Sequence, residues 1–71
     1  MFSERLKSAR ITKGLTQKAV AEYLGIITHA YQKYEYGGRE PEYDKLVKLC
    51  RLFEVSADYL LGLSDTETRQ P

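Results

Sequence analysis

The chain has 71 residues, a formal net charge of +1 and a charged-residue content of 30%. This length supports one small domain, and such a domain buries only about 60% of its unfolded surface, which argues against a large catalytic cleft. No apolar run approaches the roughly 18 residues of a membrane span, the N-terminus lacks the apolar core of a signal peptide, and the single cysteine and single histidine cannot build a disulfide or a zinc site within one chain.

The first helix is predicted over residues 3–13. Ser3 is placed to cap it, and Leu6 and Ala9 lie on its apolar face. Arg10 follows Leu6 by one helical turn and therefore lies at the edge of that face. A guanidinium group in this position needs an acidic partner.

The second helix is predicted to begin after Thr16, a favoured N-cap residue, and to run to Leu24. Its inward side carries Val20, Ala21 and Leu24. Gly25 follows, and glycine permits the positive φ angle that a tight turn needs. A third helix is therefore expected to start only a few residues later.

The third helix is predicted over residues 28–36 and ends at Gly37-Gly38. Its apolar stripe contains Ile27, Tyr31 and Tyr34. The adjoining rows are polar and never acidic; they hold Thr28, His29, Gln32 and Lys33. Two short helices joined by a tight turn form a helix-turn-helix pattern, whose second helix typically enters the major groove of DNA.

Glu35 is a misfit in the last turn of that helix, because a carboxylate there meets the negative end of the helix dipole. It needs a compensating cation. Arg10 is the candidate, since both residues lie near the inward sides of their helices. We predict a structural ion pair between Arg10 and Glu35; the alternative is two unrelated surface charges.

A fourth helix is predicted over residues 42–53, with an apolar side of Leu46, Leu49, Cys50 and Phe53. A short fifth helix follows Ser56 and stops at Gly62. Residues 1–63 should thus form one all-α domain of five helices, and residues 64–71 a polar, disordered tail. The apolar side chains of Leu60, Leu61 and Leu63 exceed what one short helix needs, which predicts a two-fold interface; the alternative is that they close the core.

The charge is unevenly distributed along the chain. Residues 1–41 hold seven Lys and Arg residues and four Asp and Glu residues, a balance of +3, whereas residues 42–71 have a balance of −2. The positive half contains the helix-turn-helix pattern, as nucleic-acid binding favours.

With these residues in place, the chain resembles the Cro and lambda-repressor-like helix-turn-helix regulators, the xenobiotic-response-element group. The resemblance covers roughly residues 3–63. Its matching positions are Arg5-Leu6-Lys7, Arg10, Gly14-Leu15-Thr16-Gln17, Ala21, Leu24-Gly25-Ile26, Tyr34-Glu35, Gly37, Arg39, Pro41, Leu46, Leu49, Phe53-Glu54-Val55-Ser56 and Asp58-Tyr59-Leu60-Leu61-Gly62.

The resemblance implies a five-helix lambda-repressor-like fold that binds a palindromic double-stranded DNA operator as a homodimer. By position, base contacts go to Thr28, His29, Gln32 and Lys33, and phosphate contacts to Gln17, Tyr36, Gly38 and Arg39. Two positions depart from the family pattern. Ile27 stands where the family often has a capping Ser or Thr, so the cap is predicted to move to Thr28, and Tyr36 stands where it often has Asn.

We therefore expect a bacterial or phage-encoded cytoplasmic regulator of transcription, a repressor in the first instance. The alternative is a partner-binding module, such as the antitoxin of a toxin–antitoxin pair or the controller of a restriction–modification system. His29 has no Cys, His or paired carboxylate near it in sequence, so neither an enzyme nor a metal site is predicted, and no cofactor or membrane is expected.

Overall fold

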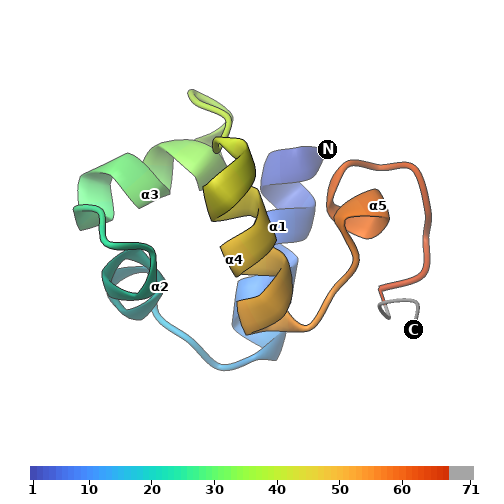
Figure 1. Cartoon of the computed structure of the whole chain (residues 1–71), viewed down its shortest axis with the longest axis horizontal. Helices are drawn as coiled ribbons and strands as arrows, with labels where there is room; N and C mark the ends of the chain where they lie inside the picture. Colours follow the sequence, from blue (N-terminus) through green and yellow to red (C-terminus); the bar gives the residue numbers. More distant parts are fainter. Residues whose placement is uncertain (68–71) are drawn as a thin grey trace.

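The computed structural model describes residues 1–67, which form five helices and no strand (Figure 1). The helices are α1 (Phe2–Thr12), α2 (Gln17–Leu24), α3 (Thr28–Tyr36), α4 (Tyr43–Phe53) and α5 (Ala57–Leu60). The predicted all-α, five-helix fold is confirmed. No helix in this part of the chain is long and apolar enough to span a bilayer.

The helix ends of the helix-turn-helix unit follow the sequence pattern. The Thr16 hydroxyl caps α2 by accepting from the Ala19 amide at 3.0 Å. Gly25, with φ +74°, ends α2 in the left-handed conformation. The cap predicted at Ser3 is wrong, because α1 begins one residue earlier, after Met1, and has no side-chain cap.

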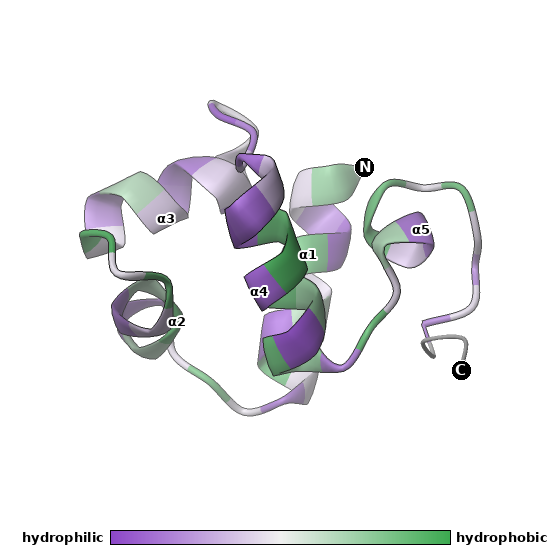
Figure 2. Ribbon diagram, in the orientation of Figure 1, coloured by the Kyte–Doolittle hydropathy of each residue, from purple (hydrophilic) through white to green (hydrophobic). Residues whose placement is uncertain are grey.

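The core lies where α1 packs against α3 and α5, and where α2 packs against α3 and α4. In Figure 2, hydrophobic and hydrophilic residues alternate along α1 and α4, as expected for helices with one buried side. The buried hydrophobic residues are Leu6, Ala9, Val20, Ala21, Leu24, Tyr31, Tyr34, Leu49, Phe53, Val55 and Leu60.

The segment that follows α5 is held against α1. Arg5 donates to the carbonyl oxygens of Tyr59 at 2.7 Å and Ser64 at 2.5 Å, and its guanidinium pairs with Asp65 at 2.9 Å. The sequence predicted a disordered tail from Ser64 onward, without these contacts. Residues 68–71 lie outside the described residues, so for them the tail stays a prediction.

Candidate nucleic-acid interface

α3 lies at the upper left of the molecule in the view of Figure 1, above α2, and it packs against both α1 and α2. Tyr31 and Tyr34 anchor it in the core, and their rings meet edge to face with centroids 5.9 Å apart. Such aromatic pairs add stabilisation beyond the area that they bury. The opposite side of α3 is therefore free to meet a partner.

None of the four residues predicted to contact bases lies on the buried side of α3. His29 and Lys33 are exposed, and Thr28 and Gln32 are half-buried. The cap predicted at Thr28 is wrong: α3 begins at Thr28 itself, after Ile27, with no side-chain cap hydrogen bond. The Thr28 hydroxyl is thus not used to cap the helix.

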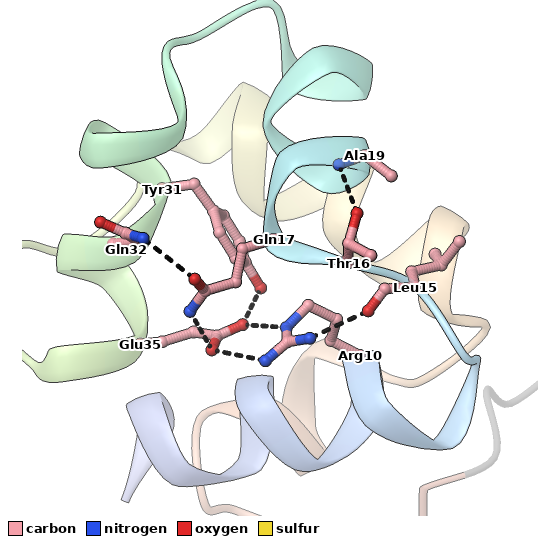
Figure 3. A network of polar contacts seen from close by, with 8 residues as sticks. All are labelled: Arg10, Leu15, Thr16, Gln17, Ala19, Tyr31, Gln32 and Glu35. Atoms are coloured by element: carbon pink, nitrogen blue, oxygen red, sulfur yellow. Dashed lines mark hydrogen bonds and ion pairs between the residues drawn. The ribbon is translucent and has the colours of Figure 1, made fainter.

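Beneath this surface, the side chain of Glu35 is fully buried, and its carboxylate accepts four hydrogen bonds (Figure 3). Its Oε2 accepts from Arg10 Nε at 2.6 Å and from the Tyr31 hydroxyl at 2.5 Å. Its Oε1 accepts from Arg10 Nη2 at 3.1 Å and from Gln17 Nε2 at 3.1 Å. Arg10 also donates Nη1 to the Leu15 carbonyl at 2.9 Å. Arg10 and Glu35, predicted to pair, therefore form a bidentate ion pair that ties α1 to α3.

These contacts decide the ionisation of the buried groups. Burial raises the pKa of Glu35, but hydrogen bonds from Arg10, Tyr31 and Gln17, together with the charge of Arg10, outweigh it and lower the pKa. Burial, and then the neighbouring Glu35, raise the pKa of Tyr31 well above its ordinary value. At neutral pH Glu35 is a carboxylate and Tyr31 a neutral hydroxyl.

This ionisation predicts a loss of stability in acid. Because the pKa of Glu35 is lower in the folded chain than its ordinary value of 4.5, the unfolded chain binds the extra proton as the pH falls. The contribution of the ionised Glu35 to the free energy of unfolding is fully present above pH 4.5. It is lost as the pH falls through the pKa of Glu35 in the folded chain. Urea unfolding followed by circular dichroism between about pH 3 and 7 should show this decline. The double variant Arg10→Met with Glu35→Leu, which removes both charges, should show a shallower decline, and equal declines for the two proteins would contradict the assignment.

Gln17, predicted to contact a phosphate, is half-buried and occupied within the protein. Its Nε2 donates to Glu35, and its Oε1 accepts from Gln32 Nε2 at 3.1 Å (Figure 3). Sequence reasoning missed both contacts. The first turn of α2 faces α3 in a helix-turn-helix unit, and this geometry is the signal that could have found them. The phosphate contact of Gln17 stays a prediction, which its second amide hydrogen allows.

Only some of the groups predicted to contact DNA phosphates at the end of α3 and in the loop after it are available at the surface. The Gly38 amide donates to the Lys33 carbonyl at 2.9 Å and closes the end of α3, so it is not available as the predicted phosphate donor. Tyr36 is 74% exposed, and Arg39 is also exposed. These two side chains remain candidates for phosphate contacts.

The helix-turn-helix family model matches residues 6–60 of this chain. The chain belongs to the helix-turn-helix family. It is 51% identical over 61 residues to the uncharacterised HTH-type transcriptional regulator YqaE of Bacillus subtilis, a match that covers 86% of this chain and 53% of YqaE. It is 48% identical over 61 residues to the prophage-derived HTH-type regulator YonR of the same organism, covering 86% of this chain and 56% of YonR.

Among solved structures, this helix-turn-helix domain resembles the P22 c2 repressor in complex with a synthetic operator. The TM-score is 0.83 at 26% identity, and the match covers 90% of this chain and 97% of the repressor chain. The predicted resemblance to lambda-like repressors, rather than to an enzyme, is confirmed by these matches. The chain spans about half the length of the two Bacillus relatives.

The leucines at the end of the helix-turn-helix domain divide into two groups. Leu60 is fully buried, so it cannot belong to the predicted dimer interface. α5 is only four residues long, and Leu60 is its one buried residue. Leu61 and Leu63 are 51% and 76% exposed and can take part. Leu61 also borders an apolar groove of about 210 Å³, whose other lining residues are Phe2, Glu40, Pro41, Tyr43 and Leu46.

No metal site was predicted, and within residues 1–67 no three His, Cys, Asp or Glu side chains are grouped so that they could hold an ion. Cys50 and His29 lie on different helices.

Proposed function

We propose that this chain is the DNA-binding domain of a transcriptional regulator, a repressor that occupies its operator through the major groove. The observation that carries the proposal is the outer side of α3, which presents Thr28, His29, Gln32 and Lys33 and no exposed carboxylate. The one acidic residue of α3, Glu35, is buried and neutralised by Arg10. A helix with such a face can approach the floor of the major groove without repelling DNA.

The side chains on this face match the hydrogen-bonding groups of base edges. A glutamine such as Gln32 bonds the N6 and N7 groups of adenine, and Lys33 favours the acceptors of guanine. Thr28 offers a methyl group to thymine, and His29 can donate or accept at a purine. Each good base contact is worth about 1–3 kcal/mol of discrimination.

Contacts to the DNA backbone fix the position of the recognition helix. The exposed side chains of Tyr36 and Arg39 flank the end of α3, and Gln17 lies at the first turn of α2. We assign these three residues to phosphates on either side of the groove. The Gly38 amide is left out because it bonds Lys33.

The second copy of the chain completes the operator-binding unit in this proposal. Two-fold association through Leu61 and Leu63 would place two α3 helices about 34 Å apart, one turn of DNA. The operator is then a palindrome of two half-sites. The two relatives named above come from Bacillus subtilis, and one of them derives from a prophage, which supports a bacterial or phage-encoded regulator acting on DNA in the cytoplasm.

Selection from random duplex DNA at near-physiological salt tests this function. We expect enrichment of two inverted half-sites with centres about one helical turn apart. Recovery of no motif, with only weak and salt-sensitive binding, would contradict operator recognition. That outcome would favour the partner-binding module, an antitoxin or a restriction–modification controller, and co-purification would then identify the partner.

The variant Gln32→Ala tests the role of α3 directly. It should reduce discrimination at one base position by about 1–3 kcal/mol while leaving non-specific affinity almost unchanged. Competition binding against the four bases at each operator position measures this. Ser8→Ala, an exposed change on α1, is the control and should alter no position. Uniform weakening across all sequences would instead assign Gln32 to the DNA backbone.

A further inference from the structure

Two hydrogen bonds connect Glu35 to the surface of α3, and both have the same donor-to-acceptor direction. Gln32 donates to Gln17, and Gln17 donates to Glu35. An ionised carboxylate only accepts hydrogen bonds, and Glu35 is held ionised by Arg10. The Gln17 amide therefore has to turn its NH₂ group, not its carbonyl, toward Glu35 Oε1. The chemistry of the carboxylate therefore fixes the orientation of the Gln17 amide.

The orientation of Gln17 dictates that of Gln32. With its NH₂ group turned to Glu35, Gln17 faces Gln32 with its carbonyl oxygen, so Gln32 has to donate. One N–H of Gln32 is used in this bond. Within residues 1–67, no other hydrogen bond of this side chain is formed, and the amide keeps its carbonyl oxygen and one N–H for a ligand.

We infer that Glu35 is a specificity-determining positioning residue, which acts through Gln17 to make Gln32 present one acceptor and one donor and so select adenine over guanine. This inference rests on the proposed function, because it requires that Gln32 meets a base edge. Adenine offers a donor at N6 and an acceptor at N7, which complement this pair. Guanine offers two acceptors, O6 and N7, so the carbonyl oxygen of Gln32 would face O6.

A fixed amide discriminates better than a free one. A solvent-exposed glutamine can rotate its amide to suit either purine, whereas reversing Gln32 here would set its carbonyl against that of Gln17. The same reversal at Gln17 would set its carbonyl against the carboxylate of Glu35. We call the hydrogen bonds from Glu35 through Gln17 to Gln32 the relay. Through this relay, the charge of a buried residue determines which base Gln32 prefers.

The variant Gln17→Lys reverses the relay. Lysine is a donor only, so it can still bond Glu35, but it forces Gln32 to accept through its carbonyl and to offer its NH₂ group outward. That group suits the two acceptors of guanine. The matched control, Gln17→Met, has a side chain of similar length with no strong donor or acceptor, and leaves Gln32 free to rotate.

The measurement is the ratio of affinities for adenine and guanine at the operator position that Gln32→Ala identifies. In the wild type we expect a ratio of about tenfold or more. Relative to Gln17→Met, Gln17→Lys should lower it at least about fivefold, with the ratios at other positions unchanged. A smaller decrease in a folded variant overturns the inference.

Two further results separate the possible failures. If Gln32→Ala alters no single base position, the proposed base contact of Gln32 fails. If it does alter one and Gln17→Lys does not shift the purine ratio there, only the relay fails. Should Gln17→Lys not fold, the double variant Arg10→Met with Glu35→Gln takes its place: it removes both charges of the buried pair together, and an amide at position 35, which permits both orientations of Gln17, should lower the ratio about threefold. An unchanged ratio in that variant also overturns the inference.

Discussion

Replacing Glu35 by alanine is expected to lower the free energy of unfolding by about 3–5 kcal/mol, because it removes one partner of a buried ion pair. The Arg10 side chain is only 12% exposed and would keep its charge with no carboxylate beside it. The Tyr31 hydroxyl and the Gln17 amide would lose the same acceptor. A core of this size supplies roughly 3–5 kcal/mol in total. The variant should therefore be largely unfolded at 25 °C, as thermal and urea denaturation followed by circular dichroism will show.

The matched control for this loss is Glu22→Ala, which removes an exposed carboxylate from α2 and should change the stability by no more than about 0.5 kcal/mol. The double variant Arg10→Met with Glu35→Leu removes both charges and should recover much of the stability. That recovery would attribute the loss to an unpaired charge rather than to lost packing. A melting temperature for Glu35→Ala within about a degree or two of the wild type would show that the pair is not buried in solution.

Much of this architecture could be predicted from the sequence because its determinants are local. The apolar spacing of α2 and the capping residue Thr16 fix where that helix begins, and Gly25 fixes where it ends. The pair of Arg10 and Glu35 could also be anticipated, since each residue is a misfit in its own helix. Two residues of opposite charge on the inward faces of neighbouring helices are both stabilised if they form an ion pair.

Most of the remaining contacts of the site could not be predicted, because they depend on distances between helices that residue spacing within one helix does not determine. The contact between the Tyr31 hydroxyl and Glu35 is an exception, because the two residues lie four apart on α3, a spacing at which helical side chains meet, and the sequence analysis missed it. The Gln17 amide was assigned to DNA, and it also bonds Glu35 and Gln32. The interface residues were misjudged at Leu60, because a helix of four residues is too short for periodicity to show which leucine points inward.

The same division of the leucines leads to the largest expected effect on operator binding. The double variant Leu61→Asp with Leu63→Asp places two charges on side chains that are 51% and 76% exposed, so the core around Leu60 should not change. In a two-fold interface, however, the charges would lose water without gaining partners. We expect a monomer whose affinity for a complete operator falls about 100-fold or more, since linking two binding modules raises affinity by about 10²–10⁴. Sedimentation and titration of a two-half-site duplex measure both quantities.

A single half-site separates this effect from charge repulsion by DNA. If the leucines act through the dimer, the double variant should bind one isolated half-site as well as the wild type does at the same monomer concentration. Ile11→Asp, which adds a charge to an exposed apolar side chain on α1, should leave both duplexes unaffected. Full affinity of the double variant for the complete operator would refute the interface at Leu61 and Leu63. Equal loss on both duplexes would assign the effect to repulsion between the added charges and the DNA, because a half-site is occupied by one copy of the chain and does not depend on the dimer.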